Sequence, residues 1–284
     1  MQRSAIKLPQ PDDWSTSTPL QPRAVGGGRV AVCADRGVTR ISDLRQSGSL
    51  KLVFPKTHRQ DVEAVIVNTA GGVTGGDRID IAADAQAGSA LTLTTQAAER
   101  AYRSQAGEVA QITTDLSVGP SARLNWLPQE LILFDRASLR RRLTIDLAED
   151  ARLLMVEPIV FGRAAMGERL RDVAFDDRIR ITRGGRPLYL DGMRLRGDVT
   201  AHLARPAIAD GAGAMVSLVF VAAEAGSHLE PVRALLPETA GTSLLAKDML
   251  VMRLLAADGF EMRRSLIPIL DLLSQNTLPT SWRL

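Results

Sequence analysis

Short stretches with β-strand character, separated by turn residues, are the feature that most constrains the fold of this chain. Residues 62–67 form a short apolar run rich in valine, and residues 78–81, 91–95 and 142–147 alternate apolar with polar side chains. Such alternation places one face of a strand against a core and the other against water or a second sheet. Proline, glycine or aspartate interrupts the chain so often that long helices are excluded before residue 228.

The clearest strand pair in the sequence is a hairpin. Residues 178–183 and 186–190 flank Gly184-Gly185, and a glycine pair supplies the positive φ angles that a tight hairpin turn requires. Residues 215–221 form an apolar run that predicts another buried strand. Because the strands do not alternate with helices, the sequence disfavours a parallel sheet built from strand–helix–strand units.

Helical signals come late in the chain. Residues 230–236 can form a short helix with Pro231 at its start. Residues 248–255 are ambiguous, but their length and context favour a strand. Residues 259–275 predict a terminal helix that Pro268 should kink. The predicted apolar face of this helix comprises Phe260, Ile267, Leu270 and Leu273.

The chain is predicted to consist of a tail and one domain. Residues 1–23 hold four prolines among Ser, Thr and Gln, which favours a flexible N-terminal tail. Residues 24–284 contain no internal repeat and no low-complexity linker, so they predict a single β-rich domain.

Charge and composition narrow the functional classes. Lys and Arg number 35 against 32 Asp and Glu, and a net charge of +3 is too small to indicate nucleic-acid binding. No apolar run approaches 18 residues and no signal-peptide core opens the chain, so we expect a cytoplasmic protein without a membrane partner. Cys33 is the sole cysteine, and the three histidines lack the spacing of a zinc or di-metal site. We therefore expect no tight metal site. The histidines are His58, His202 and His228.

A glycine-rich segment, residues 68–78, follows the predicted strand at 62–67 and ends in Asp77-Arg78. Its glycines are Gly71, Gly72, Gly75 and Gly76. A phosphate-binding loop would need a Lys-Ser or Lys-Thr pair and a following helix, and neither is present. We therefore favour a structural β-arch, in which glycines let backbones approach closely.

Acidic residues in apolar surroundings are the other candidates for chemistry. Glu157 lies inside an apolar run, where an ionised carboxylate is costly without a partner, so an ion pair with Arg163 or another arginine is favoured. A hydrolase triad would need a serine, a histidine and an acid positioned together, and the sequence shows no such set. Carboxylates at Asp77, Glu130, Asp135 and Glu157 could still serve glycosidase chemistry, so a β-rich carboxylate-dependent hydrolase remains the alternative function.

Taken in order, several of these segments resemble the UreD family of urease accessory proteins, also called UreH. The resemblance runs from about residue 29 to the C-terminus, and Val73, Phe161 and Ser281 depart from the residues most common in the family. The matching stretches are residues 67–78, 93–98, 124–130, 133–135, Glu157, 161–163, 167–168, 184–188 and 279–282.

The resemblance implies a mostly β fold of stacked, helically arranged strands with a few late α-helices. It also implies a non-catalytic scaffold that, with UreF-like and UreG-like partners, docks on apo-urease and helps deliver nickel through an internal path. Nickel would be transient, and no cofactor would be tightly bound, since oxygen ligands hold nickel less tightly than imidazole or thiolate. We expect Asp77, Asp135 and Glu157 to line or gate that route.

Overall fold

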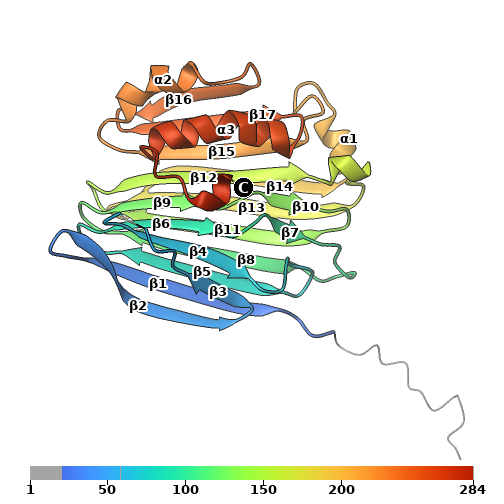
Figure 1. Ribbon diagram of the computed structural model, residues 1–284. Helices are drawn as coiled ribbons and strands as arrows, with labels where there is room; N and C mark the ends of the chain where they lie inside the picture. The colour runs from blue at the N-terminus through green and yellow to red at the C-terminus, as the bar shows by residue number, and fades with distance from the viewer. Residues whose placement is uncertain (1–20, 58, 284) are drawn as a thin grey trace, which may run out of the picture.

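The computed structural model describes residues 21–57 and 59–283, and it consists of two stacked β-sheets with helices packed near one end (Figure 1). Sheet A contains, in spatial order, β14 (Arg186–Gly197), β13 (Val173–Arg183), β11 (Ser138–Leu147), β8 (Ala110–Val118), β5 (Arg78–Ala85), β1 (Val25–Asp35) and β2 (Val38–Gly48). Sheet B contains β16 (Ala240–Ala246), β17 (Met249–Ala256), β15 (Ala214–Val221), β12 (Arg152–Phe161), β9 (Arg123–Leu127), β6 (Ala90–Thr95), β4 (Val62–Asn68) and β3 (Leu50–Val53). Two short strands extend sheet B beside β12: β10 (Leu131–Leu133) and β7 (Glu99–Ala101).

The chain winds between the two sheets, and this winding makes the central strands of each sheet parallel. In sheet A, β5, β8, β11 and β13 pair in parallel, and in sheet B, β4, β6, β9 and β12 do the same. Parallel neighbours need a long crossover connection. Here a strand of the opposite sheet provides the crossover, where many proteins use a helix. The predicted mostly β fold of stacked, helically arranged strands is therefore confirmed.

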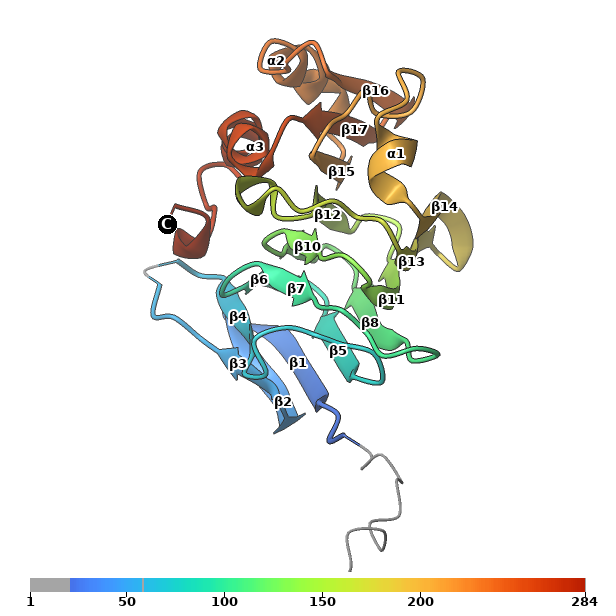
Figure 2. The ribbon, with the colours of Figure 1, turned by 90° about the vertical axis from the view of Figure 1, so that its right-hand side faces the viewer.

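Helices cover the outer side of sheet B at its C-terminal end. Figure 2 shows α3 (Gly259–Leu273) beside β12 and β15, and its buried side chains join those of the two strands in one apolar cluster. All eight residues of β15 are consequently buried. This double burial explains why β15 is apolar at every position except Ser217. The remaining helices are short: α1 (Val199–Leu203), α2 (Leu229–Arg233) and the 3-10 turns Ala164–Met166, Ala225–His228 and Thr280–Arg283.

Most predicted elements are present where the sequence placed them. The hairpin of β13 and β14 turns at Gly184 and Gly185, whose φ angles are 53° and 76°. The ambiguous stretch at 248–255 is the strand β17. Phe260 was wrongly assigned to the buried face of the terminal helix, because its side chain is 71% exposed. The helix buries Met262, Leu266 and Ile269 together with the predicted Leu270 and Leu273.

Part of the predicted tail and one histidine lie outside the described residues, namely residues 1–20 and His58. Arg23, the last residue of the predicted tail, forms an ion pair with Glu108. Among the residues that the structure describes, no helix is both long enough and apolar enough to span a membrane.

The glycine-rich segment is a tight loop between β4 and β5. Gly71, Gly72 and Gly76 have φ angles of 74°, 154° and 86°, which favour glycine. A Cβ atom on Gly72 would lie 2.3 Å from Cε2 of Tyr102 and 2.7 Å from the carbonyl oxygen of Arg100. The loop thus needs glycine both for its backbone angles and for its close approach to the segment that contains Arg100 and Tyr102.

Replacing Gly72 with valine should therefore destabilise the fold by about 2 kcal/mol or more, since a strained φ and a steric overlap act together. Denaturant unfolding of the purified chain measures the change. Gly71→Asn is the matched control: nothing lies within 4 Å of its Cβ position, and asparagine tolerates a positive φ. A Gly72→Val chain of unchanged stability that lost binding to a nucleotide would restore the phosphate-loop interpretation.

Candidate functional site

Asp77 holds the glycine-rich loop through hydrogen bonds to backbone amides. Its Oδ1 accepts a hydrogen bond from the backbone N–H of Ala24 at 2.7 Å, and its Oδ2 accepts one from Thr74 at 2.8 Å. Arg78, the next residue in the sequence, pairs with Asp80 and not with Asp77. Asp77 is buried and fully engaged with backbone amides, which supports the structural interpretation of the loop.

Asp135 has a similar role in the loop between β10 and β11. Its Oδ1 accepts hydrogen bonds from the backbone N–H groups of Arg171 at 2.6 Å and Asp172 at 3.1 Å. The guanidinium of Arg136 approaches its Oδ2 only to 3.9 Å. Asp135 also lines an open cavity of about 460 Å³ on the flank where the loops from sheet B to sheet A stack.

Glu157 lies in the interior between the two sheets, with 4% of its surface exposed. The indole Nε1 of Trp126 donates a hydrogen bond to its Oε1 at 2.6 Å, and Nη1 of Arg141 lies 2.6 Å from its Oε2. The predicted arginine partner of this acid is therefore Arg141. Arg163 is not the partner, because it lies in the loop after β12 and pairs there with Glu168.

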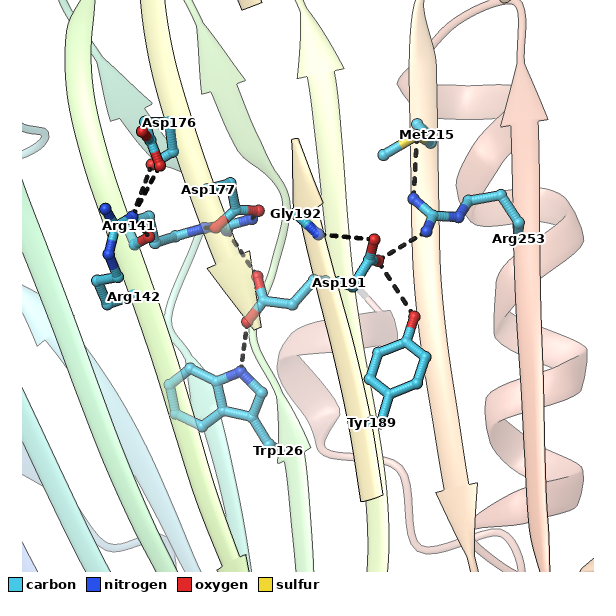
Figure 3. A network of polar contacts seen from close by, with 11 residues as sticks. Trp126, Arg141, Arg142, Asp176, Asp177, Tyr189, Asp191, Gly192, Met215 and Arg253 are labelled. Atoms are coloured by element: carbon cyan, nitrogen blue, oxygen red, sulfur yellow. Dashed lines mark hydrogen bonds and ion pairs between the residues drawn. The ribbon is translucent and has the colours of Figure 1, made fainter. Parts of the chain in front are cut away.

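Arg141 is shared between two carboxylates. Its Nε and Nη2 donate to Oδ1 and Oδ2 of Asp177 at 2.9 and 2.6 Å, in a bidentate contact (Figure 3). Arg141 and Asp177 come from neighbouring strands of sheet A, and Glu157 comes from sheet B. We call Arg141, Glu157 and Asp177 the buried triad. It crosses the core from one sheet to the other.

The buried triad carries two negative charges against one positive charge. Burial raises the pKa of Glu157, Arg141 lowers it, and the nearby charge of Asp177 raises it further; the net direction is upward. Burial alone would lower the pKa of Arg141, but the charges of Asp177 and Glu157 raise it overall. By formal charge the triad has one negative charge in excess, and the raised pKa of Glu157 reflects the cost of that excess in a medium of low polarity.

A small cavity of about 10 Å³, close to the volume that one water needs, lies beside the triad. Its lining continues towards the edge of the sheets. The lining residues are Glu157, Ile159, Asp177, Ile179, Asp191, Gly192, Met193, Met215, Ser217 and Arg253.

Three residues of the site, Arg141, Asp177 and Asp191, were not predicted from the sequence. Strand alternation could have found the first two, because Arg141 shares the buried phase of β11 with Leu139 and Leu143, and Asp177 shares that of β13 with its apolar neighbours. Asp191 gave no comparable signal, since β14 is largely exposed.

The structure does not bring the three predicted acids together. Asp77 and Asp135 hold loops on the flank, whereas Glu157 lies inside the core. Over residues 21–57 and 59–283, no three side chains of His, Cys, Asp or Glu converge closely enough to hold one metal ion.

The triad predicts that replacing either of two adjacent arginines will change the stability of the fold by very different amounts. Arg141→Gln should cost about 3–5 kcal/mol of stability, because it leaves two buried carboxylates without their counterion. Arg142→Gln should cost under about 1 kcal/mol, since Arg142 pairs with Asp176 near the surface. Urea unfolding of both variants tests this, and equal losses would contradict the assigned role of the triad.

Comparison with known proteins gives the family. A family model described as UreD urease accessory protein matches residues 24–283. The urease accessory protein UreD of Roseobacter denitrificans is 57% identical over 270 residues, which cover 95% of this chain and 98% of that protein. Those of Brucella suis and Rhizobium leguminosarum are 45% and 44% identical and cover 95% and 92% of this chain, and 98% and 96% of their own lengths. The chain therefore belongs to the UreD family of urease accessory proteins.

Proposed function

We propose that this protein is a non-catalytic scaffold in the cytoplasm, which joins UreF-like and UreG-like partners on apo-urease and passes nickel to the enzyme along an internal route. Its family supports a role in urease maturation. The observation that carries the finer proposal is Glu157, an acid kept between the two sheets as a member of the buried triad.

The chemistry of the triad suits a passing ion better than a resident one. Its donors are carboxylate oxygens, which hold nickel less tightly than imidazole or thiolate. Arg141 already neutralises part of their charge, so an arriving cation competes with a bound guanidinium. An ion can therefore be attracted here and released again.

Asp77 and Asp135 stay predictions as further residues of the route. Both use their carboxylates to hold backbone amides, which gives each a structural role. Asp135 additionally faces the open cavity on the flank, from which an ion could reach or leave the loops.

The alternative of a carboxylate-dependent hydrolase is less well supported. Glu157 and Asp177 are two buried acids that both contact Arg141. The cavity beside them has about the volume of a single water, which leaves no room for a sugar ring or an ester. We therefore propose that the chain acts through binding and transfer.

The nickel route predicts a specific phenotype for Glu157→Gln. Glutamine keeps the side-chain shape and a carbonyl oxygen for the indole of Trp126, but it removes the charge that attracts a divalent cation. The variant should fold and bind a UreF-like partner, and urease activated with it should contain less nickel. The measurements are urease-bound nickel after activation, melting temperature and pull-down of the partner.

Glu63→Gln is the matched control, because Glu63 is also buried and also pairs with an arginine, Arg59, at 2.7 Å. Urease activated with Glu63→Gln should contain the normal amount of nickel. Full nickel loading with the triple variant Asp77→Asn, Asp135→Asn, Glu157→Gln would reject the route. Loss of folding or of partner binding in Glu157→Gln alone would assign Glu157 to structure.

A further inference from the structure

Polar side chains continue from the buried triad to the edge of the sheets. In the ladder of sheet B, Glu157 lies opposite Ser217, and Ser217 lies opposite Arg253 on β17. In sheet A, Asp177 lies opposite Met193 on β14, the edge strand. The two rows face the same small cavity. Together they form a polar layer that leads from the centre of the core towards solvent.

An ion pair closes the outer end of this layer. Nη2 of Arg253 donates to Oδ2 of Asp191 at 2.7 Å, and Nη1 of Arg253 lies 3.6 Å from Sδ of Met215 (Figure 3). Tyr189 donates its hydroxyl to the same Oδ2 at 3.1 Å, and burial raises the pKa of Tyr189 to about 12, so the hydroxyl keeps its proton. We call Asp191, Met215 and Arg253 the mouth of the polar layer.

The geometry of the mouth suits the exchange of one cation for another. The guanidinium of Arg253 occupies the space between a carboxylate oxygen and a thioether sulfur. Carboxylate oxygen is a ligand for hard divalent ions and thioether sulfur is a ligand for softer metals, so the pair offers an ion of intermediate softness two donor atoms. The Arg253 side chain is 43% exposed, so it can swing into water at small cost, whereas Arg141 is buried and cannot.

Charge favours the same exchange. The polar layer holds three carboxylates, Glu157, Asp177 and Asp191, against two guanidinium groups, Arg141 and Arg253, which leaves one negative charge. Replacing Arg253 by a divalent cation brings the layer to neutrality. Further inside, Oε2 of Glu157 forms an ion pair with Nη1 of Arg141 at 2.6 Å. An ion that moves inward past Ser217 would therefore meet a carboxylate that already shares a guanidinium with Asp177.

We infer that Asp191 and Met215 form the site where a divalent nickel ion first binds this chain, by displacing Arg253, before it moves inward to Glu157. The inference rests on the proposed function, because it names where the nickel route through the core begins. Neither residue is among those predicted from the sequence to lie on the route, which were Asp77, Asp135 and Glu157.

Nickel binding to the full chain tests the mouth directly. Nickel sulfate is titrated into each purified variant in competition with a chromophoric chelator. Asp191→Asn should weaken binding at least about tenfold, because even groups that only orient a metal ligand contribute about ten- to a hundred-fold. Arg253→Gln should tighten binding, since Asp191 loses its competing guanidinium. The double variant should bind as weakly as Asp191→Asn.

A second ion pair offers a matched control. Arg283 and Asp271 have side-chain exposures of 45% and 20%, against 43% and 21% for Arg253 and Asp191. Asp271→Asn and Arg283→Gln should leave nickel affinity unchanged. Unchanged affinity in Asp191→Asn, or no gain in a folded Arg253→Gln chain, would overturn the inference. The expected gain keeps the test decisive even if Asp191→Asn folds poorly.

The amount of nickel bound to urease after activation distinguishes a failure of the mouth from a failure of the whole internal route. If Glu157→Gln lowers urease-bound nickel while Asp191→Asn loads it fully, the mouth is wrong and the proposed function stands. If both variants lower it while Asp271→Asn does not, the mouth is supported. If neither lowers it, the internal route fails and the mouth fails with it.

Discussion

The contact of Arg141 with Glu157 and Asp177 ties the two sheets of this protein together through the core between them. A buried ion pair of this kind contributes little net stability compared with a well-packed apolar cluster, because desolvation offsets the attraction. Such an ion pair can instead fix how the strands of one sheet are aligned with those of the other. Glu157 meets Arg141 only when β12 and β11 are stacked in one alignment, and a shift by one residue would turn each side chain to the opposite face.

The packing around this contact is asymmetric, and the asymmetry determines its electrostatics. On the outer side of sheet B, α3 and the C-terminal segment bury a second apolar cluster, so that β15 and most of β12 are buried on both faces. Trp282 is part of this cover, and its indole donates to the carbonyl oxygen of Leu127 at 3.0 Å. Low polarity around the triad strengthens its attraction for cations. On the β14 and β17 side of the triad, the side chains of Asp191 and Arg253 are partly exposed to solvent.

The candidate site could be predicted from the sequence only in part. An acid inside an apolar run must have a partner, and for Glu157 the structure supplies one in Arg141. The particular arginine was not predictable, because Arg163 is close in sequence but lies beyond the end of the strand. Asp77 and Asp135 also stood beside apolar or glycine-rich sequence. They are engaged with backbone amides of loops, a role that follows from turn geometry and leaves no signature in composition.

The sequence by itself determined the strand periods, the turns and the lateness of the helices, because each depends on side chains a few residues apart. Alternation in β11 and β13 even fixed that Arg141 and Asp177 face inward. Only the tertiary structure decided which inward-facing groups meet. Trp126 and Glu157 are 31 residues apart, and Asp191 and Arg253 are 62 apart, yet each pair is in contact. The physical reason is that a strand's period specifies its buried face, whereas the winding of the chain between two sheets specifies what that face packs against.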